Sequence, residues 1–307
     1  MKYLLYSIMV AAALTACGHR ASQQNAEGTV ASEDQALSAS AELTTDSIGL
    51  EREDSMVSVK VSIDWPTGSN QQLVSGIRQY ICEELSSSIN QESKPEVKVF
   101  DDGKTAVEAT VKRQYDDLAG MWKESKENGM PMDMTYSYFL HVFKMEETER
   151  YITYLSKSEG FLGGAHGYAT ATGITFSKKD GRRIGYQTEY NREKDTFEMK
   201  DQTLFSNPNS EQLAAIIKEG VRSYFQQFDT DVTTDEQLKD MLIGVDDINK
   251  IPLPTNPPLF TKEGLCFTYQ QYEIACYAVG LVSFTVPYAK IRPLLTEEAA
   301  TLIPSSK

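Results

Sequence analysis

The amino-acid sequence predicts an α+β fold, with antiparallel sheets packed against amphipathic helices in two related or intimately packed subdomains. Three observations lead to this class. Apolar and polar residues alternate in short segments, as they do in half-buried strands. In longer segments the apolar residues recur every three to four positions, as on the buried face of a helix. Between residues 132 and 176 the sequence changes to runs of Tyr, Phe, Thr and Val, the residues that strands favour.

The first half of the folded region contains both kinds of pattern. Val57, Val59, Val61 and Ile63 alternate with polar residues and predict a strand. Helical spacing of apolar residues predicts one helix over about 70–87, and a second around 107–122 that Asn128-Gly129 closes. The Tyr- and Phe-rich segment then predicts three strands in an antiparallel meander, at about 133–145, 149–159 and 167–177.

The second half begins with a helix and ends in strands. Ser210 is a typical N-cap, and apolar residues at helical spacing follow it as far as Phe228. A short helix is expected near 234–243, and four prolines between 252 and 258 exclude regular structure there. Alternating apolar residues at 265–269 and 282–286 predict the final strands.

The N-terminus predicts an exported lipoprotein. Lys2 precedes an apolar stretch at 3–14, which is too short to span a bilayer because a transmembrane helix needs about 20 residues. Leu14-Thr15-Ala16-Cys17 resembles the lipobox at which bacterial signal peptides are cleaved before a lipidated cysteine. We therefore expect a signal peptide at 1–16 and lipidation of Cys17, which anchors the chain to a membrane without a spanning helix. Since no Asp or Glu follows Cys17 closely, the expected location is the outer membrane, facing the periplasm.

The region after the cysteine divides into three parts. Residues 17–54 are rich in Ser, Ala, Gln and Glu and contain no aromatic residue, so they predict a lipidated cysteine followed by a flexible tether. An N-terminal α+β module is expected over 55–190, and a C-terminal α+β module over 191–307.

Charge and residue counts exclude several functions. The chain has a formal net charge of −14, which repels phosphate backbones and excludes nucleic acid as an expected partner. It contains only three histidines and no Cys-x-x-Cys pair, so neither a metal site nor a cofactor is predicted. Beyond Cys17 there are Cys82, Cys266 and Cys276. The last two either form a disulfide or remain buried free thiols, and their apolar neighbours favour the thiols.

A glycine-rich turn is the candidate ligand contact. His166 lies among Gly163, Gly164 and Gly167. These residues are interpreted primarily as a structural turn, because glycine tolerates positive φ and a histidine can bind backbone groups there. A ligand contact through His166 is the alternative. No catalytic constellation is found, and the acidic pairs at 101–102, 116–117 and 246–247 are interpreted as solvated turns and faces.

Two stretches carry a resemblance to a known family. The first contains GGAHG at 163–167 and FSKKDGRR at 176–183; the second runs from FTKEGLCF at 260–267 to FTVPY at 284–288. Together they resemble the extracellular-domain family of the lysozyme-sensing anti-sigma factor RsiV, a module that also accompanies the peptidoglycan deacetylase PdaC. The resemblance covers about residues 56–295. It departs from the family in a long insertion, Gly185 to Met199, and in the lack of a deacetylase or sigma-binding segment.

This resemblance implies a paired α+β module of the cell envelope, and in RsiV such a module binds lysozyme. We therefore expect a non-catalytic binding lipoprotein whose partner is a cationic protein such as lysozyme or a cell-wall glycan. The alternative is a hydrolase that acts on peptidoglycan with carboxylates alone, since two acids suffice for glycoside hydrolysis.

Overall fold

The computed structural model describes residues 43–87, 96–130, 134–191, 193, 196–229 and 231–303. The signal peptide, Cys17 and most of the predicted tether lie outside these residues. The described residues fall within one compact unit, Ser40–Lys307. The α+β prediction is confirmed: helices pack on largely antiparallel sheets.

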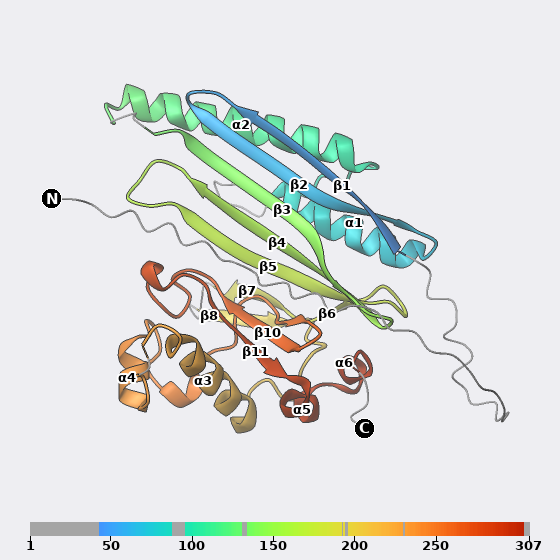
Figure 1. The fold of residues 1–307 in the computed structure, drawn as a ribbon, viewed down its shortest axis with the longest axis vertical. Helices are drawn as coiled ribbons and strands as arrows, with labels where there is room; N and C mark the ends of the chain where they lie inside the picture. Colours follow the sequence, from blue (N-terminus) through green and yellow to red (C-terminus); the bar gives the residue numbers. More distant parts are fainter. Residues whose placement is uncertain are drawn as a thin grey trace, which may run out of the picture. The chain divides into compact units, whose positions relative to one another are not determined.

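The first half of the chain is built on a six-stranded sheet of order β1-β2-β3-β4-β5-β6 (Figure 1). Its strands are β1 (Leu43–Glu53), β2 (Val57–Gly68), β3 (Tyr136–Glu147), β4 (Tyr151–Phe161), β5 (Tyr168–Ser177) and β6 (Arg183–Ile184). Helices α1 (Gln71–Ser86) and α2 (Gly103–Glu127) lie in the chain between β2 and β3 and pack on one face of the sheet. The predicted helices and the β3–β5 meander are therefore present.

One pairing differs from the expected antiparallel pattern. β2 and β3 pair in parallel, with Val57 opposite Tyr136 and Ile63 opposite Val142. The reason is the connection between them: α1 and α2 carry the chain back across the sheet, so β3 starts at the same end as β2.

The predicted tether is also too long, because Leu43–Glu53 forms strand β1. This strand pairs with β2 along its whole length, from Leu43 opposite Gly68 to Glu53 opposite Ser58. Only Leu43 of this strand is fully buried. The composition of this segment is therefore typical of a tether, but backbone hydrogen bonds to β2 hold the segment as a strand.

The second half contains two small sheets and several short helices. A hairpin of β7 (Gln187–Asn191) and β8 (Thr196–Lys200) forms within the sequence insertion, and β9 (Leu259–Phe260), β10 (Gly264–Tyr269) and β11 (Val282–Pro287) form a three-stranded sheet. The helices are α3 (Glu211–Phe225), α4 (Asp235–Asp240), η2 (Ile248–Lys250), η3 (Tyr277–Val279), α5 (Tyr288–Ile291), η4 (Arg292–Leu294) and α6 (Glu297–Thr301). Ser210 caps α3 as expected, by accepting a hydrogen bond from the Leu213 N–H at 3.3 Å.

Buried apolar side chains form two clusters, one in each half. The first joins β1–β5 to α1 and α2; the second joins Tyr151 of β4 and Ile184 of β6 to the elements from Tyr186 onwards. The division into modules at 190 and 191 stays a prediction. Among the described residues, no helix is both long enough and apolar enough to cross a membrane.

The packing of α3 on β11 gives a test of the second cluster. A β-carbon at Gly220 of α3 would lie 2.1 Å from the Phe284 ring, whereas one at Gly120 of α2 would meet nothing within 4 Å. Glycine normally weakens a helix, so Gly120→Ala should raise the free energy of unfolding by about 0.5–1 kcal/mol. Gly220→Ala should instead lower it by about 1–3 kcal/mol, because the added methyl overpacks the interface. Urea denaturation of both variants checks this, and equal stabilisation would contradict the packing.

Candidate functional site

A cleft of about 1170 Å³ has the six-stranded sheet as its floor. Strands β3, β4 and β5 form the floor, and the C-terminal part of α1 forms one wall. The opposite wall comes from β6, the segment after it, and the Asn256 and Gln270 regions. In Figure 1, β4 and β5 lie between the helices of the first half and the elements of the second half.

The floor carries hydroxyl groups where a sheet covered by helices normally carries apolar side chains. Ser156 and Ser158 of β4 stand opposite Thr172 and Thr170 of β5, respectively. All four line the cleft, and we call them the hydroxyl strip. Ser156 is buried and the other three are half-buried. Buried polar groups are retained where they have partners to bind, so this strip distinguishes the cleft floor from the core.

Helix α1 presents a carboxyl group to the hydroxyl strip. Glu84 Oε2 accepts a hydrogen bond from Thr172 Oγ1 at 3.5 Å. Burial raises the pKa of Glu84 above its ordinary value, while hydrogen bonds from Ser156 and Thr172 oppose the shift. The protonated form of this carboxyl is therefore favoured more than in water, and it can donate as well as accept a hydrogen bond.

The neighbouring carboxylate has a different role. Glu83 forms a bidentate ion pair with Arg183 of β6, with distances of 2.8 Å and 3.0 Å between the guanidinium nitrogens and the carboxylate oxygens. This pair joins α1 to the sheet and neutralises both charges at the wall of the cleft. Burial also disfavours the charge on Glu84. Among the described residues that line the cleft, the third carboxylate is Asp201, which is exposed.

Tyrosines complete the walls, and one of them has no partner. Tyr80 of α1, Tyr138 of β3, Tyr168 of β5 and Tyr186 line the cleft, and burial raises the pKa of each of them. Their hydroxyls therefore stay protonated. The Tyr186 hydroxyl donates to Pro254 O at 2.8 Å. The Tyr80 hydroxyl is buried and makes no hydrogen bond of good geometry to a described residue, although the neighbouring Thr172 hydroxyl lowers its pKa against the larger effect of burial.

Glutamines from the second half fix the wall beside β5. Gln270 donates to Ala171 O at 2.8 Å and accepts from Ala171 N at 3.1 Å, and Gln271 accepts from Ala169 N at 3.0 Å. These side chains satisfy backbone groups on the part of β5 that β6 does not cover. The contacts hold the second half against the strand and so set the position of the wall.

The glycine-rich turn lies between β4 and β5, at the end of the cleft marked by Tyr168. Gly163 has φ +78°, and a β-carbon there would overlap the Tyr136 ring, so glycine is required. Gly164 lies in open space, whereas a β-carbon at Gly167 would lie 2.6 Å from Gly160 O. His166 is exposed, and its Nδ1 lies 2.8 Å from Gly167 O. The histidine also stacks on Tyr277 of the second half, with ring centroids 3.8 Å apart.

Other candidate residues have local roles. Asp102 caps α2, Asp116 pairs with Lys112 on the surface of the same helix, and Asp247 caps η2. The three cysteines of the described region are free thiols, so Cys266 and Cys276 do not pair. Cys276 is exposed, in contrast to the buried thiol that its apolar neighbours suggested. Within the same region, no three His, Cys, Asp or Glu side chains gather as metal ligands would.

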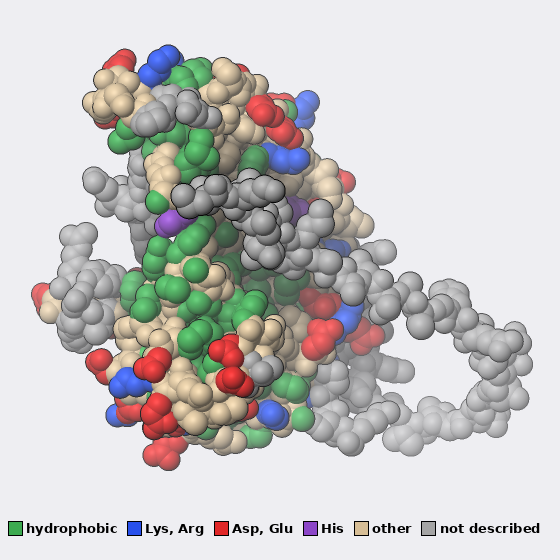
Figure 2. Space-filling model, turned by 60° about the vertical axis from the view of Figure 1, so that its left-hand side comes forward, with side chains coloured by type: hydrophobic (Ala, Val, Ile, Leu, Met, Phe, Trp, Pro, Cys, Tyr) green, Lys and Arg blue, Asp and Glu red, His purple; other side chains and the backbone are tan. Residues whose placement is uncertain are grey.

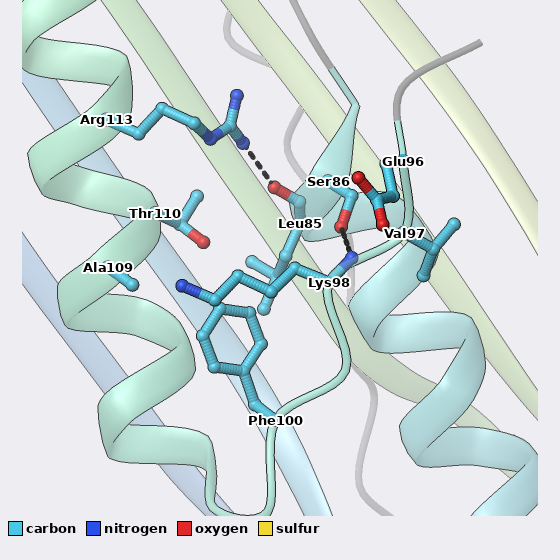
Figure 3. Close-up of a pocket in the computed structure, with 9 residues that line it drawn as sticks. All are labelled: Leu85, Ser86, Glu96, Val97, Lys98, Phe100, Ala109, Thr110 and Arg113. Carbon is cyan, nitrogen blue, oxygen red and sulfur yellow. Dashed lines mark hydrogen bonds between the residues drawn. The ribbon is translucent and has the colours of Figure 1, made fainter.

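A second, smaller pocket of about 560 Å³ lies between the end of α1, the middle of α2 and residues 96–100 (Figure 3). Its polar groups are used internally: Arg113 donates to Leu85 O at 2.6 Å, and the Lys98 N–H donates to Ser86 Oγ at 3.0 Å. This pocket therefore offers fewer free partners to a ligand than the cleft does.

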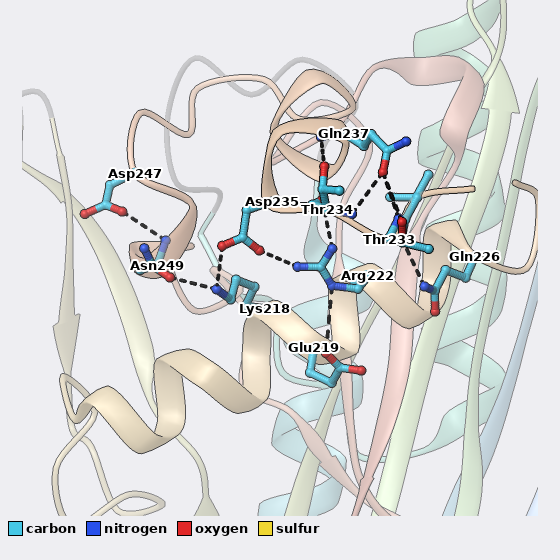
Figure 4. A network of polar contacts seen from close by, with 11 residues as sticks. Lys218, Glu219, Arg222, Gln226, Thr233, Thr234, Asp235, Gln237, Asp247 and Asn249 are labelled. Atoms are coloured by element: carbon cyan, nitrogen blue, oxygen red, sulfur yellow. Dashed lines mark hydrogen bonds and ion pairs between the residues drawn. The ribbon is translucent and has the colours of Figure 1, made fainter. Parts of the chain in front are cut away.

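The surface of the second half is acidic around α3 and α4. Figure 2 shows hydrophobic side chains gathered in the middle of one face and acidic ones along its lower part. Lys218 and Arg222 of α3 both bind Asp235, and Lys218 also binds Asn249 Oδ1 at 2.7 Å (Figure 4). The cations are thus occupied within the network. Several carboxylates around it remain exposed: Glu219, Asp229, Asp231, Glu236, Asp240, Asp246 and Asp247.

Comparison with known proteins places this arrangement in context. Residues 202–289 match a family described as "Protein of unknown function (DUF3298)", a match that runs from the segment before α3 to the start of α5. No curated protein matches the sequence.

Two solved structures resemble the fold. A DUF3298 family member from Bacteroides fragilis has a TM-score of 0.55 and 19% identity, with 84% of this chain and 94% of that one covered. A DUF3298 family protein from Pseudomonas aeruginosa has a TM-score of 0.52 and 13% identity, with 88% of this chain and all of that one covered. At these identities the likeness concerns the fold alone.

The raised pKa of Glu84 gives a test of the cleft that needs no ligand. The folded protein holds the proton of this carboxyl more tightly than the unfolded chain does, so stability should fall as pH rises above the ordinary value of about 4.5. Glu84→Gln removes the charge, and its advantage in free energy of unfolding over the wild type should therefore grow between pH 4 and pH 7. Urea denaturation across this range measures the difference. A constant difference would show that Glu84 is not buried as described.

Proposed function

We propose that this protein is a non-catalytic binding lipoprotein of the cell envelope that holds an uncharged segment of a glycan in the cleft. The observation that carries the proposal is the hydroxyl strip beneath the unpartnered Tyr80 hydroxyl. Sugars present many hydroxyl groups that donate and accept hydrogen bonds, and their apolar ring faces pack on aromatic side chains. The Glu83–Arg183 ion pair neutralises two charges at the wall, and burial disfavours the charge on Glu84 by raising its pKa; both favour a ligand without charge, although the chain as a whole is acidic.

The size of the cleft indicates an extended ligand. Pockets for single small molecules measure about 300–1,000 Å³. The cleft, at about 1170 Å³, exceeds that range, and its lining includes residues from β3, β4 and β5. We therefore infer an oligomer of sugars rather than a single sugar. The resemblance to the RsiV extracellular-domain family supports a place in the envelope, where such chains occur.

A pair of tyrosine variants tests the cleft. Tyr80→Phe and Tyr154→Phe each remove one buried hydroxyl that lacks a partner, but Tyr154 does not line the cleft. Tyr80→Phe should weaken binding of β-1,4-linked N-acetylglucosamine oligomers roughly three- to tenfold, since a hydrogen bond contributes about 0.5–1.5 kcal/mol. Tyr154→Phe should bind as the wild type does. Isothermal titration calorimetry measures both, and absence of heat with every oligomer would refute glycan binding.

The hydrolase is the second candidate, and the environment of Glu84 is the observation that favours it. A carboxyl group with a raised pKa beside a cleft can act as a general acid. The mechanism also needs a second carboxylate, and Asp201 at the rim is the remaining cleft-lining candidate because Glu83 is paired with Arg183. Release of reducing ends during the titration, lost in Glu84→Gln, would replace the binding role with hydrolysis.

A cationic protein such as lysozyme is the rival partner. The exposed carboxylates around α3 and α4 would attract it, and this attraction weakens as salt screens the charges. The same calorimeter distinguishes the cases. One-to-one binding of lysozyme near physiological salt, with no heat from the oligomers or from another folded basic protein, would show that the partner is a protein.

Membrane anchoring through Cys17 belongs to the same proposal and has a separate test. Cells that express the full chain should incorporate labelled palmitate into the wild type and not into Cys17→Ala, because the cysteine sulfur carries the lipid. Cys82→Ala serves as the control, since Cys82 is a buried thiol and should not affect labelling. Equal labelling of the wild type and Cys17→Ala would contradict the lipoprotein assignment.

A further inference from the structure

An aromatic cluster lies where the glycine-rich turn meets the second half. It consists of His166, Tyr272 and Tyr277, and we call it the aromatic cluster. The His166 and Tyr277 rings are stacked with centroids 3.8 Å apart and an interplanar angle of 21°. His166 Nε2 lies 3.2 Å from the Tyr272 hydroxyl, and Nδ1 lies 2.8 Å from Gly167 O. Both ring nitrogens of His166 thus have partners, and the Tyr272 and Tyr277 rings also contact each other, with centroids 6.1 Å apart.

Tyr272 has an unusual backbone conformation. Its φ is +66°, in the left-handed region that favours glycine and that a bulky side chain rarely adopts. The side chain is nevertheless 56% exposed, so burial of its ring does not offset the strain. A strained residue persists where its surroundings hold it, and such residues cluster at ligand-binding positions.

The aromatic cluster continues the line of the cleft. Tyr168 lines the cleft and is two residues from His166, and Gln270 lines it and is two residues from Tyr272. The hydrogen bonds of Gln270 to Ala171 and of Gln271 to Ala169 bring the turn around Tyr272 to the same end of β5. Thr172, Thr170, Tyr168 and then the cluster therefore follow one another along this strand.

We propose that the exposed Tyr272 ring, held in place by His166, is a stacking subsite for a sugar ring of a chain that extends out of the cleft. This inference rests on the proposed function and specifies the length of its ligand. The stacked rings of His166 and Tyr277 already connect the two halves at this turn. That connection does not explain a third ring that is exposed and strained, whereas the apolar face of a sugar needs an exposed ring of fixed orientation.

The test is the dependence of affinity on chain length. For the wild type, affinity for N-acetylglucosamine oligomers should rise from the dimer to the hexamer as the chain reaches Tyr272. Tyr272→Ala should reduce hexamer affinity roughly three- to tenfold and leave dimer affinity unchanged, because an aromatic contact contributes about 0.5–1.5 kcal/mol. Tyr272→Phe retains the ring but loses the hydroxyl that contacts His166, so its hexamer affinity should lie between those of the wild type and Tyr272→Ala.

Two controls separate the outcomes. Tyr272→Gly removes the ring and also relieves the strained φ, so it should lose the hexamer preference while folding at least as stably as Tyr272→Ala. Phe228→Ala removes another exposed ring, 73% exposed just after the end of α3, and should not change the chain-length dependence because Phe228 neither lines the cleft nor belongs to the aromatic cluster. Equal hexamer affinity in the wild type and Tyr272→Ala would overturn the subsite but not the cleft. No binding of any oligomer to the wild type would overturn both.

Discussion

Two buried threonine hydroxyls join the halves of this molecule. Thr153 Oγ1 donates to Phe260 O at 2.8 Å, the Phe260 N–H donates to Thr175 Oγ1 at 3.2 Å, and the two hydroxyls lie 2.9 Å apart. Both threonines are completely buried. A short strand such as β9 packed across a sheet needs partners for its backbone groups, and these hydroxyls supply them. With β9 fixed there, the segment that follows can reach the uncovered part of β5, and a cleft remains between that segment and α1.

The periodicity of the sequence predicted the elements whose burial is one-sided. The helices α1, α2 and α3 and the meander β3–β5 follow from apolar spacing, since each places one face against a core. Strand β1 was not predicted, because few of its side chains are buried and its order comes from backbone pairing with β2. The parallel pairing of β2 and β3 was not predicted either, because it depends on the path of the two connecting helices and not on the pattern of either strand.

The candidate site was harder to predict from the sequence than the fold, because its residues come from separate segments. The turn around His166 was visible in the sequence, and the structure brings this residue to Tyr272 and Tyr277, more than a hundred positions away. The cleft itself gave a weaker signal. Glu84 occurs seven positions after the buried Ile77, on the apolar side of α1, and Ser156 replaces an apolar residue on the inner face of β4. Polar residues at buried positions were the available sign, but only pairing register shows that they converge.

The parallel pair β2–β3 has a consequence for the order in which the molecule folds. Its partners Val57 and Tyr136 are far apart in the chain, so this contact closes a long loop at a high entropic cost. The hairpins β3–β4 and β4–β5 connect neighbouring segments and close short loops. Since local contacts form faster than distant ones, the strands of the cleft floor should associate first. The helices of the first half then dock as β2 joins the sheet. The floor of the cleft should therefore form before its helical wall.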